Sequence, residues 1–209
     1  MMRGPTHRCT GRPSAARELT LGRTEPSLVM TTVDLDVKFR LMVETDVPLL
    51  HEWIQRPHVA EWWGGRGASA HLEDTKRKYL PQLRDSSSVK CHFAILHGEP
   101  IGFIQSYVAI GCGDGWWQDE TDPGVRGIDQ FLGDDSKLGQ GLGTRMVTAF
   151  VRKLFEDPSV TKVQTDPNPV NGRAIRCYEK AGFRIVGKIV TPDGAALLMV
   201  IEKGCARAA

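Results

Sequence analysis

The hydrophobic pattern of residues 125–166 predicts a strand, a helix and a second strand in succession. Val125–Leu132 is a short, mostly apolar run typical of a buried strand, and Val160–Asp166 is another. Between them, apolar side chains recur at helical spacing from Thr144 to Phe155, with the stripe Met146, Val147, Phe150, Val151 and Leu154. This order favours a right-handed parallel crossover.

The rest of the chain is predicted to add hairpin strands and two helices. The strands are expected over Val37–Val43, Val89–His97, Ile101–Ile110, Ile185–Thr191 and Ala195–Glu202. A capped helix is predicted from Thr45 to about Arg56, followed by an interruption at Glu61–Gly65 and a second helix over roughly Ser69–Leu80.

Three glycines precede the helix at Thr144, and they predict an anion site. Gly139, Gly141 and Gly143 leave main-chain N–H groups free to surround an anion, which the helix dipole also favours. A nucleotide P-loop would need Lys and then Ser or Thr after the last glycine, whereas Thr144 and Arg145 stand there. A dinucleotide fingerprint would need an acidic residue at the end of a strand at a set distance, which is missing.

A second segment, Asn171–Phe183, predicts a short capped helix. Asn171 suits the N-cap, and Ala174, Ile175 and Tyr178 share one helical face. Gly182 suits a left-handed C-cap, after which a strand begins.

The glycine turn, followed by the pattern Asn-x-x-Ala-x-x-x-Tyr-Glu-Lys-x-Gly-Phe, resembles the GCN5-related N-acetyltransferases. The resemblance implies an α/β (α+β) fold with a central mixed, mostly antiparallel sheet flanked by helices, and a parallel βαβ core that carries the CoA turn. It also implies that acetyl-CoA is the co-substrate, with no metal, and that Tyr178 protonates the departing thiolate. Leu138 departs from the Gln or Arg usual in the family. The cofactor-binding residues implied are Phe131, Leu132, Gly139, Gln140, Gly141, Leu142, Gly143, Thr144 and Asn171.

The segment from Asp114 to Asp135 combines acidic and aromatic residues. It holds seven acidic residues and one basic residue, Arg126, and includes the pair Trp116–Trp117. A charge run alone is usually a solvated face. Adjacent tryptophans in a glycine-rich loop instead favour stacking on a ring-shaped ligand, and Trp62–Trp63 form a second pair expected in a loop. The combination indicates a cationic acceptor.

The motifs Glu-Trp-Trp-Gly-Gly, Gly-Asp-Gly-Trp-Trp and Gly-Ile-Asp-Gln resemble the aminoglycoside 6′-N-acetyltransferases of the Ib/II type from Arg40 to about Val200. The resemblance implies transfer of acetyl to the 6′-amine of aminoglycoside antibiotics, which inactivates them. It makes Asp129 the catalytic carboxylate. The substrate-binding residues implied are Trp63, Tyr79, Asp114, Trp116, Trp117, Asp129, Asp166 and Asp193.

From the residues alone, Asp129 has two interpretations. Its carboxylate interrupts an apolar strand and either pairs with a neighbour such as Arg126 or serves a ligand. Asp166 ends the next parallel strand, where ligands of open α/β sheets collect. Cys177 is expected to pack away from the site, because successive helical residues point about 100° apart, so direct transfer is favoured over a Cys-linked intermediate.

Two other functions stay open: acetylation of a protein or peptide amine in the same fold, and a non-catalytic acyl-CoA or drug-binding module. Composition restricts the partners further. Five arginines and two glutamates in residues 1–30 leave a net charge of −1 on the remaining chain, which does not indicate a nucleic-acid partner. Monomer and homodimer remain undecided.

Five cysteines without C-x-x-C spacing favour a reducing compartment, hence a cytoplasmic location, and no apolar run reaches membrane-spanning length. Residues 1–36 are predicted to be a disordered leader, since the first thirty are rich in Arg, Thr, Pro and Gly and lack the apolar core of a signal peptide. The acetyltransferase domain is expected over residues 37–203, with a tail at 204–209.

Overall fold

The computed structural model describes residues 36–63, 70–113 and 115–204. The predicted leader lies outside these residues except for Asp36, and the predicted tail does so except for Gly204, so both stay predictions. Within the described ranges, no helix combines the length and the apolar character that crossing a membrane requires.

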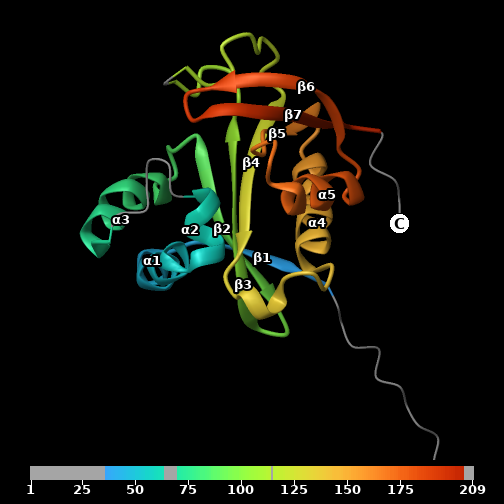
Figure 1. Cartoon of the computed structure of the whole chain (residues 1–209). Helices are drawn as coiled ribbons and strands as arrows, with labels where there is room; N and C mark the ends of the chain where they lie inside the picture. The colour runs from blue at the N-terminus through green and yellow to red at the C-terminus, as the bar shows by residue number, and fades with distance from the viewer. Residues whose placement is uncertain (1–35, 64–69, 114, 205–209) are drawn as a thin grey trace, which may run out of the picture. The chain divides into compact units, whose positions relative to one another are not determined.

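The core of the fold is a seven-stranded sheet with the order β1-β2-β3-β4-β5-β7-β6 (Figure 1). β4 and β5 pair in parallel, and every other neighbouring pair is antiparallel. The predicted mixed, mostly antiparallel sheet with one parallel crossover is therefore confirmed. The strands are β1 Lys38–Leu41, β2 Val89–Leu96, β3 Glu99–Val108, β4 Val125–Leu132, β5 Lys162–Thr165, β6 Arg184–Thr191 and β7 Gly194–Glu202.

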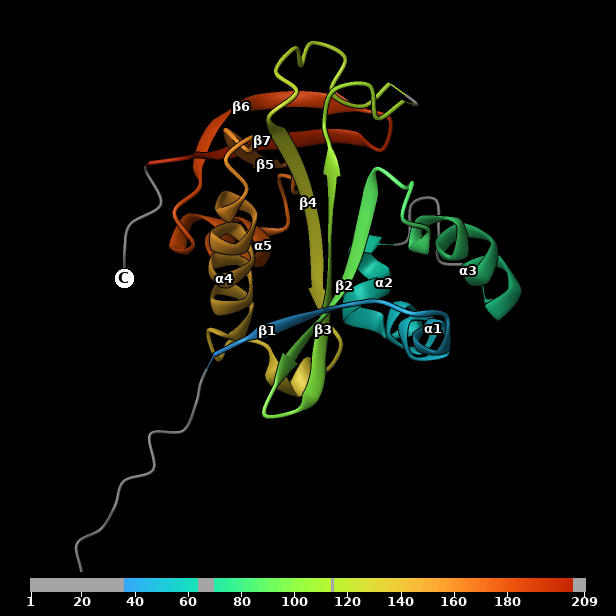
Figure 2. The ribbon, with the colours of Figure 1, turned by 180° about the vertical axis from the view of Figure 1, so that it is seen from behind.

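Helices cover both faces of this sheet, with α1, α2 and α3 on one side and α4 and α5 on the other, as the two opposite views agree (Figures 1 and 2). The strands are therefore buried on both faces. In β3, for example, Phe103 joins the cluster beneath α1 and α2, and its neighbour Ile104 joins the cluster beneath α4. The helices are α1 Val47–Gln55, α2 Pro57–Trp63, α3 Leu72–Tyr79, α4 Leu142–Glu156 and α5 Gly172–Lys180.

The first helical region differs from the prediction. Glu44–Asp46 is a 3₁₀ turn, and α1 begins at Val47. Arg56 is extended (φ −69°, ψ 135°), as a residue before proline prefers, and Pro57 then starts a separate helix, α2. The expected interruption at Glu61–Gly65 is thus wrong for Glu61–Trp63, and Trp62 and Trp63 are helical rather than loop residues.

The parallel pair β4–β5 is short. Among the described residues, it runs from Val125 opposite Lys162 to Gly127 opposite Gln164. β4 continues to Leu132 paired only with β3, while β5 pairs with β7 on its other side. The second half of β4 thus has peptide groups on one edge that β5 does not use. A cavity lies beside this half of β4.

Candidate active site

A cavity of about 310 Å³ lies against the half of β4 that β5 does not pair with. Its wall is formed by the end of β4, the glycine-rich turn, the outer face of α5 and residues of α2. Seven of the nine predicted cofactor-binding residues line it: Phe131, Leu132, Gly139, Gly141, Gly143, Thr144 and Asn171. The other two are placed beside it. Gln140 donates its side-chain amide to the carbonyl of Ser136 at 2.6 Å, and Leu142 packs against the core cluster under the first turn of α4.

Two of the three glycines of the turn are required by their backbone conformation. Gly139 and Gly141 have left-handed backbones, with φ of 75° and 78°, which an L side chain rarely adopts. Gly143 lies inside α4, where a Cβ would make an ordinary van der Waals contact of 3.4 Å with Sγ of Cys177, so the packing of α5 does not require glycine there. Because α4 starts immediately after Gly141, its free N–H groups border the cavity.

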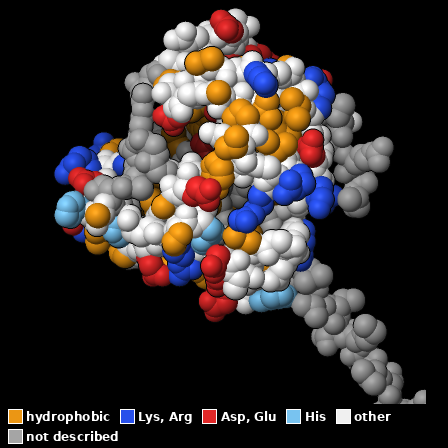
Figure 3. All heavy atoms as spheres, viewed as in Figure 1, with side chains coloured by type: hydrophobic (Ala, Val, Ile, Leu, Met, Phe, Trp, Pro, Cys, Tyr) orange, Lys and Arg blue, Asp and Glu red, His pale blue; other side chains and the backbone are white. Residues whose placement is uncertain are grey.

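Four cationic or titratable side chains surround the same cavity and were not predicted. Arg173, Arg176 and Lys180 reach it from α5, and all three are exposed. Lys and Arg side chains gather over this region of the surface (Figure 3). From α2, a ring nitrogen of His58 lies 2.9 Å from the carbonyl oxygen of Leu132 at the end of β4. Because three of these four side chains are positively charged, the cavity suits a ligand that carries several negative charges.

Asn171 is the N-cap of α5, and Tyr178 lies within this helix. The Asn171 side chain accepts a hydrogen bond from the amide of Ala174 at 3.0 Å, which is the predicted N-cap, and Gly182 adopts the predicted left-handed C-cap with φ of 100°. Tyr178 is buried and hydrogen bonds with Thr165 and Gln130, while its burial raises the pKa of the phenol. The hydroxyl therefore keeps its proton at neutral pH and can donate it.

The expectation for Cys177 needs correction. Rather than packing away from the site, it lines the cavity, and its sulfur lies 3.8 Å from the hydroxyl of Thr144. The helix turns this residue outward while the next residue, Tyr178, points into the core. Burial raises the pKa of the Cys177 thiol, so it lacks the thiolate character of a nucleophile.

Asp129 lies on β4, half-buried, and its partner is Gln105 rather than Arg126. The Gln105 amide donates to Oδ2 of Asp129 at 2.8 Å, whereas Arg126 donates to the carbonyl of Pro123 at 2.8 Å. Loss of hydration raises the pKa of Asp129, against the opposing effects of Gln105 and of the positive charge of Lys78. The carboxylate is thus oriented by a neutral donor, and within the described residues it forms no ion pair.

Two further predicted acidic residues lie within electrostatic range of Asp129. Asp166 follows β5, and burial, reinforced by the charges of Asp129 and Asp193, raises its pKa to about 8. Asp193 is exposed in the turn between β6 and β7. Asp114 lies outside the described residues. Three carboxyl groups near one another repel each other when they are ionised. A bound polycation would stabilise their charged forms.

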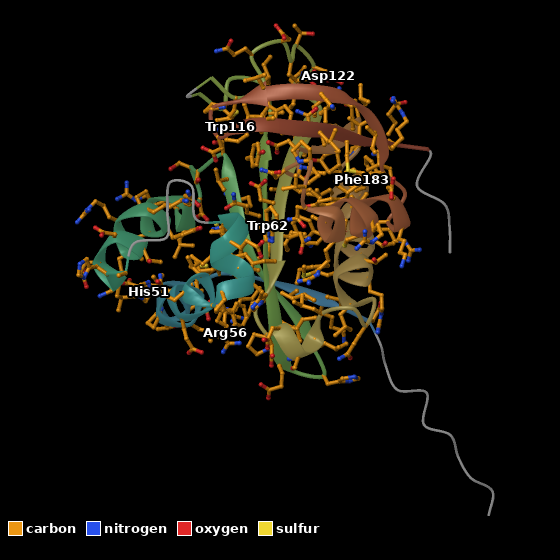
Figure 4. The ribbon with its side chains drawn as sticks, viewed as in Figure 1. His51, Arg56, Trp62, Trp116, Asp122 and Phe183 are labelled. Carbon is orange, nitrogen blue, oxygen red and sulfur yellow. The ribbon has the colours of Figure 1, made fainter. Side chains whose placement is uncertain are left out.

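The predicted aromatic residues form two separate pairs of contacts. Trp63 donates its indole N–H to the hydroxyl of Tyr79 at 3.0 Å and packs edge-on against Phe131, with ring centroids 4.8 Å apart. Trp117 donates to the hydroxyl of Tyr107 at 3.2 Å, and its ring lies 6.3 Å from that of Trp116. The two tryptophan pairs come from different elements. Trp62 lies on α2, whereas Trp116 lies in the loop near the β6–β7 hairpin (Figure 4).

Comparison with known proteins identifies the family. The family model described as an acetyltransferase (GNAT) domain matches residues 42–191. The chain belongs to the GNAT acetyltransferase family. The predicted resemblance and fold class are confirmed.

This GNAT chain is similar to the aminoglycoside N(6')-acetyltransferase type 1 of Klebsiella pneumoniae, with 57% identity over 180 residues, 86% of this chain and 89% of the relative. A kanamycin resistance protein of Rhizobium radiobacter is 66% identical over 85 residues, 41% of this chain and 79% of that protein. The crystal structure of the aminoglycoside acetyltransferase AAC(6')-Ib with coenzyme A and kanamycin is 55% identical, with a TM-score of 0.77, covering 81% of this chain and 96% of that one.

In this GNAT domain, Gln105 and Tyr107 on β3 were not predicted as site residues. A signal existed, because both are polar positions two apart in a strand and therefore point to the same face. What the sequence could not supply was the register, which puts Gln105 opposite Asp129 and Tyr107 opposite Gly127.

Proposed function

We propose that this chain transfers the acetyl group of acetyl-CoA to the 6′-amine of aminoglycoside antibiotics. The observation that carries the proposal is that one strand, β4, borders both halves of such a site. Its end lines the cavity with the glycine-rich turn, and Asp129 on the same strand belongs to the acidic group with Asp166 and Asp193. The relatives named for aminoglycoside acetylation and kanamycin resistance support the same activity.

Acetyl-CoA would bind in the cavity, where the three glycines and the N-terminus of α4 suit its pyrophosphate. The adjoining edge of β4 beyond Gly127 offers peptide N–H groups that β5 does not engage. These groups are suited to polarise the thioester carbonyl as negative charge develops on its oxygen. No metal is needed for this step.

Asp129 would orient the acceptor amine and receive its proton. A carboxyl group near pKa 4 cannot remove a proton from an ammonium near 10, since the gap of about six units costs roughly 8 kcal/mol. The raised pKa of Asp129 narrows that gap. An ammonium has no lone pair, so the neutral fraction of the bound amine attacks the thioester. Asp129 then receives a proton from the nitrogen, directly or through water, as the C–N bond forms and that nitrogen becomes strongly acidic.

Tyr178 would complete the reaction by donating its proton to the departing CoA sulfur. Its raised pKa keeps the donor protonated until the C–S bond breaks. The thiol of Cys177 is half-buried and its raised pKa leaves it unactivated, which supports direct transfer between the two bound substrates.

The product would bind its ribosomal target poorly. Acetylation removes a positive charge and a hydrogen-bond donor, both of which hold the drug on RNA phosphates and bases. The cytoplasm, which supplies both acetyl-CoA and ribosomes, is the compartment that this activity requires.

An acetyl-CoA turnover assay tests the proposal against the two alternatives. Thiol release should follow addition of aminoglycosides with a 6′-amine and be absent with matched 6′-hydroxy compounds. Release with lysine-containing peptides instead would favour a protein acetyltransferase. Tight acetyl-CoA binding with no release for any amine would indicate a binding module.

A further inference from the structure

Trp117 has a backbone conformation that tryptophan rarely adopts. Its φ is 50°, in the left-handed region, and among the described residues only His97 shares this feature outside glycine. A side chain with a Cβ is disfavoured there, so other contacts must hold the residue in place. One such contact is made by the side chain itself, whose indole N–H donates to the hydroxyl of Tyr107 at 3.2 Å.

Tyr107 is in turn held against the strand that carries the catalytic carboxylate. It lies opposite Gly127 in the β3–β4 register, and a Cβ on Gly127 would collide with the Tyr107 ring. Glycine at 127 thus makes room for the ring to lie flat on β4, two residues from Asp129. Burial and the nearby carboxyl groups of Asp129 and Asp166 raise the pKa of Tyr107, which keeps its hydroxyl neutral.

The loop between β3 and β4 makes further contacts on the C-terminal side of Trp117. Lys162 of β5 forms an ion pair with Glu120 at 2.9 Å, and the hydroxyl of Thr161 donates to Asp122 at 2.6 Å. The backbone from Glu120 onward is thus attached to β5, whereas the indole of Trp117 is attached to β3. The hydroxyl of Tyr107 thus links the Trp117 indole to the β3 position next to the strand that carries Asp129.

We propose that Tyr107 is a positioning residue for the acceptor: its hydroxyl, seated over Gly127, holds the Trp117 indole where it contacts the aminoglycoside. The inference rests on the proposed function and on Trp117 as part of the acceptor site. Tyr107 acts through Trp117 and exchanges no proton with the substrate.

The test is a double-mutant cycle on the full chain with Tyr107→Phe and Trp117→Phe. Tyr107→Phe keeps the ring on Gly127 and removes only the hydroxyl. It should raise the aminoglycoside KM about threefold to tenfold, the effect of one neutral hydrogen bond, with kcat and the acetyl-CoA KM unchanged. In the Trp117→Phe background the same substitution should have no further effect. The matched control is Ser106→Ala, which removes a buried hydroxyl from the opposite face of β3 and should leave KM unchanged.

Additive effects of the two substitutions on KM would overturn the inference, because Tyr107 would then contact the acceptor independently. A fall in kcat with unchanged KM would also overturn it and place Tyr107 in the chemical step. Tyr107→Phe should change the tryptophan fluorescence of the parent protein. In the Trp117→Phe background, the same substitution should leave the fluorescence unchanged. Failure of the proposed function is recognised separately, since the parent protein would then release no thiol with any 6′-amino aminoglycoside.

Discussion

Gln105 donates its side-chain amide to Oδ2 of Asp129 at 2.8 Å, from the position directly opposite in the β3–β4 register. Because the donor is neutral, it fixes the direction of the carboxylate without supplying the counter-charge that an arginine would. The acceptor ammonium can then become the counter-ion. This relationship separates the role of Asp129 from that of the surrounding acidic residues.

Asp129→Asn should lower kcat about 10²-fold or more, because shape and hydrogen bonding remain while the proton acceptor is lost. The acetyl-CoA KM should hardly change. Asp193→Asn is the matched comparison, since Asp193 is exposed and its charge acts on both Asp129 and Asp166. It should raise the aminoglycoside KM at unchanged kcat, with a smaller effect at high salt. Steady-state kinetics of both variants decide, and exchanged signatures would reverse the two roles.

Gly141→Ala should raise the acetyl-CoA KM several-fold. No atom stands within 4 Å of the added Cβ, so the effect comes from the left-handed backbone, which costs an L residue about 1–2 kcal/mol. Gly187→Ala is the matched control, because an added Cβ at Gly187 also meets no atom within 4 Å but the backbone there is not left-handed. Titration with acetyl-CoA should distinguish the two, and equal affinities would place the cofactor turn elsewhere.

Replacing Arg173 and Lys180 together by Gln should weaken acetyl-CoA binding, because both cations border the cavity from α5. The loss should be greatest at low ionic strength and shrink as salt is added. Lys188→Gln removes an exposed charge from β6 and should have no effect. A cofactor affinity without salt dependence in the parent protein would contradict a role for these charges.

Asp166→Asn should change how stability depends on pH. The folded-state pKa of Asp166 is about 8, above the unfolded value of 3.8, so the folded state holds the proton more tightly. Asp166 therefore costs no stability below pH 4 and destabilises the fold increasingly as pH rises from about 4 to about 8. The variant should melt several degrees higher than the parent at pH 8 and at a similar temperature near pH 4. Parallel melting curves across this range would show that Asp166 ionises normally.

Local pattern was sufficient for much of this molecule. The limits of β4 agree with the apolar run Val125–Leu132, and the caps at Asn171 and Gly182 are as predicted, because strand burial and helix capping depend on neighbours in the chain. The resemblance then predicted nine cofactor-binding residues, and all of them except Gln140 and Leu142 line one cavity. The break between α1 and α2 was also local, since Pro57 signals it, and it was missed.

The sequence by itself determined the strand–turn–helix that presents the glycines and the residue types of the acceptor site. Only the tertiary structure decided which groups act on those residues. Gln105 rather than Arg126 orients Asp129, Tyr107 holds Trp117, and Cys177 faces the cavity. These relations depend on strand register and helix docking, which join positions up to some thirty residues apart through contacts that no local spacing encodes.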